Sequence, residues 1–210
     1  MIHKFIDDLA TCIQFGNVTN QYSINWKYSN ICRENLNLYL NAMIKLKPKA
    51  LLVGEAPGYK GCRLSGIPFT AEYNLSIDYK EGLLFGFRNG YSVRNPMNMQ
   101  KENSATIVWK VLKELDRFPL MWNAFPFHPY QDGNTESNRR PNSNELIYGA
   151  NILRRIIELY NVQTIIGVGR IAENILEKIG FKSIGIRHPS MGGKNEFVYK
   201  MIQLKDRKEI

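Results

Sequence analysis

Residues 51–58 read Leu-Leu-Val-Gly-Glu-Ala-Pro-Gly, an apolar run that stops in a tight turn carrying one acid. The apolar residues predict a short buried strand over 49–53, and the glycines and the proline predict its end. Open α/β sheets bind their ligands beyond the carboxyl ends of their strands. The turn therefore places Glu55 where a ligand site is expected, although a plain turn with Glu55 in solvent fits the same residues.

The composition is that of a globular protein of one domain. Of 210 residues, 44% are hydrophobic and 22% are charged, which is ordinary for such proteins. No apolar stretch approaches the ~20 residues that cross a bilayer, and residues 1–8 carry acids where a signal peptide would be apolar. We therefore expect a cytoplasmic protein without a membrane partner. The three cysteines, Cys12, Cys32 and Cys62, are too widely spaced to indicate a disulfide framework or a metal site.

The charge balance favours anionic partners. The chain has 28 basic and 19 acidic residues, which give a net charge of +9. A positive field of this size attracts nucleic acid first. Charge alone does not establish that the protein binds nucleic acid, because many basic proteins bind nothing specific.

Hydrophobic periodicity predicts an alternating order of helices and strands. Helices are expected over 1–15, 33–46, 102–115, 143–160, 170–179 and 196–204, and further strands over 118–125, 162–168 and 183–186. Strands that alternate with helices predict a parallel sheet covered on both faces. The predicted fold class is therefore α/β, with three layers (α/β/α) and a central four-stranded parallel sheet.

We expect one domain over 1–210, with residues 1–47 as a helical N-terminal extension packed on it. The predicted core faces of the first three helices follow helical spacing and comprise Ile2, Phe5, Ile6, Leu9 and Ile13, then Leu36, Leu40, Met43 and Ile44, then Ala105, Val108, Leu112 and Leu115. Asn142 or Ser143 is expected to cap the helix over 143–160. Residues 56–102 carry mainly loop signals, and a loop this long inside a compact domain is usually functional.

Two later segments also place polar side chains after predicted strands. Asn123 lies near the end of the strand over 118–125, where a buried amide is costly unless it is hydrogen-bonded; it either ties down a loop or reads a ligand. His188 follows the strand over 183–186 and is either a structural histidine or a ligand contact. The small residues Ser190, Gly192 and Gly193 after it can present backbone N–H groups to a phosphate.

Three other features have simple structural explanations. Phe69, in the turn over 66–70, either anchors a loop in the core or stacks on a ligand. His128 is interpreted as a loop residue. Residues 167–172 (Gly-Val-Gly-Arg-Ile-Ala) formally match a dinucleotide fingerprint, but no acid closes a strand about twenty residues further on. Small residues at a tight strand–helix junction explain this segment better.

Taken in order, these segments resemble the motifs of the uracil-DNA glycosylase superfamily. The match runs through residues 54–58 (Gly-Glu-Ala-Pro-Gly), 66–70 (Gly-Ile-Pro-Phe-Thr), 123–126 (Asn-Ala-Phe-Pro), 167–172 and 188–190 (His-Pro-Ser). It covers roughly residues 48–204 and is closest to the branch with a Gly-Glu-Ala-Pro-Gly first motif. That branch often carries a four-cysteine iron–sulfur cluster. This chain has three cysteines without the expected spacing, so we expect no metal cluster.

The resemblance implies a DNA repair enzyme that flips uracil, or a related deaminated base, out of DNA and hydrolyses its N-glycosidic bond. Phe69 would stack on the base, Asn123 would read its polar edge, and His188 would donate to uracil O2 as negative charge develops on the leaving base. The other implied contacts are Gly54, Ala56, Pro57 and Gly58 in the pocket wall, Ser190, Gly192 and Gly193 on a DNA phosphate, and Met191 as a wedge in the gap left by the base. The implied partner is uracil-containing DNA, and we expect a monomer without a cofactor.

Activation of the attacking water is assigned to Glu55 as a hypothesis. The most active branch of the family has an aspartate at the third position of the first motif, where this chain has Ala56. Two other functions stay open. Ala56 favours a non-catalytic protein of the same fold that binds uracil or damaged DNA. A hydrolase of small nucleosides or nucleotides is the other alternative, and the net charge of +9 disfavours it.

Overall fold

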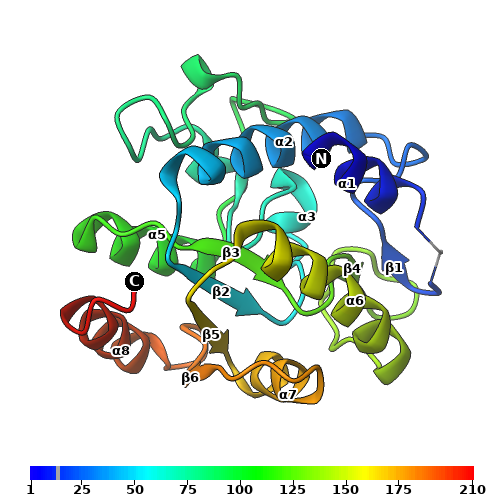
Figure 1. The fold of residues 1–210 in the computed structure, drawn as a ribbon. Coiled ribbons are helices and arrows are strands. Elements are labelled where there is room, and N and C mark those ends of the chain that lie inside the picture. Colours follow the sequence, from blue (N-terminus) through cyan, green and yellow to red (C-terminus); the bar gives the residue numbers. More distant parts are fainter. Residues whose placement is uncertain (13–14) are drawn as a thin grey trace.

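A four-stranded parallel sheet forms the centre of the molecule (Figure 1). A computed structural model of the chain describes residues 1–12 and 15–210. The strand order is β3-β2-β5-β6, with bounds β2 Ala50–Gly54, β3 Leu120–Asn123, β5 Thr164–Val168 and β6 Ile184–Ile186. Gly54 pairs with Asn123 in register at the carboxyl ends of β2 and β3. The first and third sequence motifs therefore meet at one edge of the sheet.

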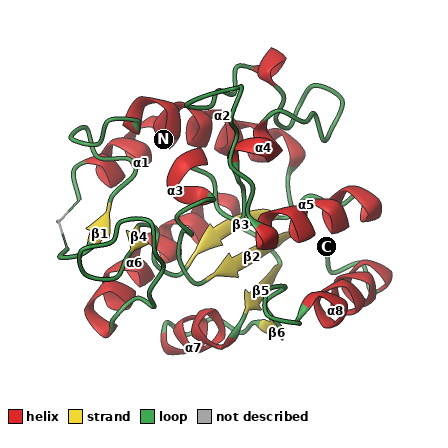
Figure 2. Cartoon of the chain, turned by 180° about the vertical axis from the view of Figure 1, so that it is seen from behind, coloured by secondary structure: helices red, strands yellow, loops and turns green. Residues whose placement is uncertain are grey.

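Helices cover both faces of this sheet. On one face lie α5 (Asn103–Leu115) and α8 (Lys194–Asp206), which contact each other; on the other lie α6 (Ser143–Tyr160) and α7 (Arg170–Lys178), which also contact each other. Figure 2 shows the same separation from behind. The predicted α/β/α architecture with a four-stranded parallel sheet is confirmed.

The N-terminal helices close the β3 edge of the sheet. These are α1 (Ile2–Ala10) and α2 (Ser29–Leu46), which pack on each other. The Tyr39 hydroxyl on α2 accepts a hydrogen bond of 2.8 Å from the backbone N–H of Met121 in β3. Phe5 on α1 packs on Trp122 with 5.6 Å between ring centroids. The N-terminal helices thus cover this edge strand and satisfy its Met121 backbone N–H group.

The long segment between β2 and α5 is ordered by short helices and a buried ion pair. The helices are α3 (Cys62–Ser65), α4 (Glu72–Leu75) and the 3₁₀ helix η1 (Phe87–Asn89). Glu72 is fully buried, and its carboxylate accepts hydrogen bonds from the Arg94 guanidinium at 2.9 and 3.0 Å.

A separate two-stranded antiparallel sheet joins β1 (Val18–Thr19) to β4 (His128–Pro129). No helix in the described ranges has both the length and the hydropathy needed to cross a membrane.

Several predicted boundaries need correction. The first helix ends at Ala10 rather than at residue 15, and the second begins at Ser29 rather than at residue 33. Ile44 is 48% exposed, not buried, because the apolar stripe of α2 passes through Tyr39 and Met43 and leaves Ile44 at its margin. The predicted core residue Ile13 lies outside the described residues. The four predicted core residues of α5 are buried.

Candidate active site

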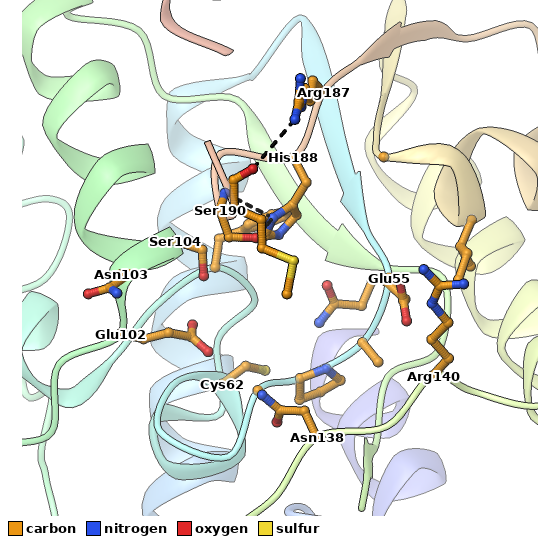
Figure 3. Close-up of a pocket in the computed structure, with 18 of the residues that line it drawn as sticks. Glu55, Cys62, Glu102, Asn103, Ser104, Asn138, Arg140, Arg187, His188 and Ser190 are labelled. Carbon is orange, nitrogen blue, oxygen red and sulfur yellow. Dashed lines mark hydrogen bonds between the residues drawn. The ribbon is translucent and has the colours of Figure 1, made fainter. Parts of the chain in front are cut away.

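A cavity of about 1360 Å³ opens at the carboxyl edge of the sheet (Figure 3). All four strands deliver residues to it, because Glu55, Asn123, Gly169 and His188 lie at or just beyond their carboxyl ends. The predicted site residues that line the cavity are Glu55, Ala56, Pro57, Gly58, Phe69, Asn123, His188, Ser190 and Met191. Parallel strands that end at one edge thus gather segments more than 130 residues apart in the sequence.

Gly54 lets an aromatic ring and an amide meet at the end of β2. A Cβ atom at this position would lie 2.6 Å from Phe69 Cζ and 2.7 Å from Asn123 Oδ1. Both distances are too short for real contacts, so only glycine permits the arrangement. Phe69 has a left-handed backbone with φ of 54°, a conformation that costs energy in a non-glycine residue and concentrates at functional sites. The ring and the amide therefore form two walls of one slot.

The Asn123 side chain reaches the cavity without a hydrogen bond to another described residue. Asn123 is 4% exposed and lines the cavity. Within residues 1–12 and 15–210, its side chain forms no hydrogen bond. Its backbone is fixed, because the next residue, Ala124, donates to the Gly54 carbonyl at 2.8 Å. Because the amide faces the cavity and is not tied to another part of the chain, it is available to a ligand.

His188 presents one hydrogen-bond donor to the cavity. Its Nδ1 atom accepts a hydrogen bond of 3.2 Å from the backbone N–H of Ser190 and lies 2.7 Å from the Ser190 hydroxyl. Burial lowers the pKa of His188 below its ordinary value of 6.5. The ring is therefore neutral at pH 7, and because Nδ1 is an acceptor, the proton resides on Nε2. No other described residue bonds to Nε2, which leaves this donor available.

Glu55 lies half-buried on the same cavity wall as Arg140, opposite Glu102 (Figure 3). Burial raises the pKa of the Glu55 carboxyl, and the positive charge of Arg140 opposes that rise. Arg140 follows Arg139, whose guanidinium bonds to the buried carboxylate of Glu145 at 2.7 and 2.8 Å. Asn142 is the N-cap of α6, and its backbone N–H also donates to Glu145. This anchor holds the backbone next to Arg140, whose side chain lines the cavity.

Glu102 is a second carboxylate that the sequence did not reveal. It is the N-cap residue of α5, and a Cβ atom at Gly58 or Gly61 would collide with its carboxylate. Burial raises the pKa of Glu102, and a hydrogen bond with Ser104 opposes that rise. The acid lies more than 40 residues from the turn that it touches, so no local pattern signals the contact.

Cys62 also lines the cavity, as a fully buried thiol. Burial raises the pKa of Cys62 well above its ordinary value, which keeps it protonated. Among the residues that the structure describes, no three histidine, cysteine or acidic side chains converge as metal ligands.

The segment expected to hold DNA lies between β6 and α8. Met191 is 95% exposed at the cavity rim. The Ser190 hydroxyl lies 2.7 Å from His188 Nδ1, and its contact with a DNA phosphate stays a prediction. Gly192 and Gly193 do not line the cavity. A Cβ atom at Gly193 would collide with the His188 carbonyl oxygen, so this glycine lets the chain fold tightly behind the histidine.

His128, interpreted from the sequence as a loop residue, holds the first motif in place. Its ring is fully buried, and Nδ1 donates to the Pro57 carbonyl at 2.7 Å. Burial lowers the pKa of His128 to about 4. The neutral ring thus fixes the turn that carries Glu55, from a strand of the separate two-stranded sheet.

The buried His128 makes stability depend on pH. The unfolded chain takes up a proton below pH 6.5, whereas the folded protein resists it until about pH 4. The contribution of His128 to the free energy of unfolding is therefore complete above pH 6.5. This contribution falls by about 3 kcal/mol in all as the pH falls toward 4. Urea unfolding of wild type and His128→Gln at several pH values between 7.5 and 4.5 checks this. The wild-type free energy of unfolding should fall more steeply, and parallel curves for the two proteins would refute the assignment.

Comparison with known proteins places this chain in a family. Residues 42–205 match the family described as the uracil DNA glycosylase superfamily. Among solved structures, the fold is similar to that of wild-type SMUG2 from Pedobacter heparinus, with a TM-score of 0.65 and 16% sequence identity over 100% of this chain and 99% of that chain. At this identity the likeness shows the fold alone. No curated protein matches the chain. Because the family match spans most of the sequence, the chain belongs to the uracil DNA glycosylase superfamily.

Proposed function

We propose that the protein removes uracil, or a related deaminated base, from DNA by hydrolysing the N-glycosidic bond of a flipped nucleotide. The main support is the buried Asn123 amide, which has no hydrogen bond to any described residue and lies beside the Phe69 ring. A uracil ring in this slot would stack on Phe69. Its O4 and N3–H groups would pair with the amide donor and the amide acceptor of Asn123.

His188 is suited to stabilise the leaving base. When the N-glycosidic bond breaks, its electron pair moves onto the base and negative charge develops on uracil N1 and O2. A neutral imidazole that donates from Nε2 stabilises this charge as an oxyanion-hole donor does. Water then adds to C1′ of the sugar and loses a proton, for which Glu55 is the proposed acceptor.

The role of Glu55 is tested by Glu55→Gln, which keeps the size of the side chain and removes the base. We expect base release to slow by about 10-fold, below the usual 10²–10⁴ for a general base, because an oxocarbenium-like transition state needs little activation of water. The measurement is the single-turnover rate of uracil release with protein in excess. Glu34→Gln, on α2 and away from the cavity, is the matched control. An undiminished rate in Glu55→Gln would exclude Glu55 as the base.

DNA is the proposed substrate because of the charge and the exposed rim. The net charge of +9 favours a polyanion. Met191, almost fully exposed beside the cavity, has the apolar side chain required to fill the gap left by a flipped base. Proteins that do chemistry on a base must take it out of the stack.

The function is tested with uracil-containing single- and double-stranded oligonucleotides. Strand breakage after alkali reports base loss and is the expected result. Ala56 favours one rival, a protein that keeps the pocket but has lost turnover. Tight binding of uracil-containing DNA by folded protein without any alkali-labile site would establish that rival and reject the enzyme.

A further inference from the structure

A second cavity of about 560 Å³ adjoins the first. Tyr59 and Lys60 line both cavities. Its other walls include Tyr28 at the start of α2, Arg63 on α3, and Arg94 from the long segment before α5. A DNA strand whose flipped base occupies the first cavity can therefore place its next nucleotide in the second cavity.

The second cavity has an excess of positive charge. Its lining includes three cations, Lys60, Arg63 and Arg94, and one acid, Glu136. Arg63 donates from Nε to the Tyr59 carbonyl at 3.1 Å and from Nη1 to the Thr135 carbonyl at 3.0 Å. Its Nη2 atom has no hydrogen bond to any residue that the structure describes. The guanidinium is thus held in place with one donor group unused.

Arg94 has a similar unused donor. Its Nε and Nη2 atoms bond to the buried Glu72 carboxylate, and within the described part of the chain Nη1 has no partner. Glu72 also accepts the backbone N–H groups of Arg94 and Gln100, both at 3.1 Å. A fully buried carboxylate is costly unless it is well paired. Here the Glu72 carboxylate fixes residues 94–100 as one wall of the cavity and orients the Arg94 guanidinium.

Two half-exposed tyrosine rings complete the cavity. The guanidinium carbon of Arg94 lies 5.4 Å from the centroid of Tyr28, and Lys60 Nζ lies 5.4 Å from the centroid of Tyr59. Aromatic rings beside cations are how proteins bind unpaired nucleotides, since every base has a face that can stack. The volume falls within the ~300–1,000 Å³ range of pockets for small ligands, too small to admit a duplex.

We propose that this cavity binds the unpaired nucleotide next to the flipped one, with its phosphate between Arg63 and Arg94 and its base on Tyr28 or Tyr59. The inference rests on the proposed function and names the form of its substrate, a single strand that continues on one side of the uracil. It also assigns a role to residues 94–100, which none of the sequence motifs includes.

The test varies the strand on each side of the uracil. Single-stranded oligonucleotides with deoxyuridine at the 5′ end, at the 3′ end or inside are compared by kcat/KM for uracil release and by fluorescence anisotropy for binding. A nucleotide added on the side of the uracil that enters the second cavity should raise both kcat/KM and the binding affinity by about 5- to 100-fold, which is the effect of stacking one base. Arg63→Gln should remove this gain and reduce the slope of log affinity against log salt by about 0.7, the value for one phosphate contact on a single strand.

Matched variants separate stacking from charge. Tyr28→Phe and Tyr59→Phe keep an aromatic ring and should keep the gain from the added nucleotide. Tyr28→Leu and Tyr59→Leu remove the ring, and the variant that loses this gain identifies the ring on which the base stacks. Arg154→Gln removes a guanidinium that also bonds to a backbone carbonyl, that of Ile179 at 3.1 Å, but lines neither cavity. This control should keep the gain.

Two failures are distinguishable. If uracil is released but Arg63→Gln retains the full gain and the wild-type salt slope, the second cavity is not a nucleotide site and the proposed function stands. If no substrate releases uracil, the proposed function fails, and fluorescence anisotropy still tests whether the second cavity binds a nucleotide. Equal affinities of wild type and Arg63→Gln for all three oligonucleotides would overturn the inference.

Discussion

An Asn123→Ala protein is expected to release uracil about 10³-fold more slowly than wild type. Truncation leaves two buried polar groups of the base without partners, at roughly 2 kcal/mol each, and each 1.4 kcal/mol is a factor of ten. The loss should appear in kcat/KM on uracil-containing DNA, because the amide binds the base throughout the reaction.

Stability separates this interpretation from a structural one. The Asn123 side chain has no hydrogen bond to any described residue in the free protein, so removing it should leave the melting temperature unchanged or raised. Asn151→Ala, at an exposed asparagine of α6, is the control; it should leave uracil release unchanged and, because alanine favours a helix, should not lower the melting temperature. A large drop in melting temperature for Asn123→Ala, with uracil release in proportion to the folded fraction, would show that the amide is structural.

A His188→Ala protein is expected to be about 10²–10³-fold slower, the usual loss when one donor to a developing anion is removed. The pH dependence gives a second signature. Protonation of His188 puts a proton on Nδ1, which then opposes the Ser190 backbone N–H. Because burial lowers the pKa of His188, the acid limb of the wild-type profile should lie below pH 6.5.

The measurement is the single-turnover rate of uracil release between pH 5 and pH 8. His188→Ala should be slow and should lack the acid limb. His3→Ala removes an exposed histidine of α1 and should retain both the rate and the limb. An acid limb that persists in His188→Ala would belong to another group, first of all Glu55, because burial also raises the pKa of that carboxyl. A wild-type rate of uracil release in His188→Ala would remove the role assigned to His188.

The order of elements was predictable because each carries its own local signal. The helix over 143–160 was predicted with the bounds found for α6, since Asn142 and Glu145 form a capping box around an amphipathic run. The four strands were located by their apolar runs, although three are shorter than predicted. The short helices α3 and α4 were missed, because four residues are too few to show helical periodicity.

The candidate site was predictable wherever its residues end strands. Glu55, Asn123 and His188 follow apolar runs, and the topology of a parallel sheet gathers such positions at one edge. Glu102 and His128 were not found, because they reach the first motif through contacts with Gly58 and Pro57 that no local pattern records. Sequence motifs thus located the groups proposed to touch the base, and the structure added the groups that hold them in place.

The proposed function requires that the bond between uracil and its sugar is cleaved in this cavity. The most direct measurement is the single-turnover rate of uracil release from one single-stranded oligonucleotide by wild type and by the Asn123→Ala, His188→Ala double variant, both shown to be folded. Wild type should render every deoxyuridine site alkali-labile, and the double variant should leave the strand intact over the same time. Intact strands with the wild-type protein, or equal rates for the two proteins, would contradict it.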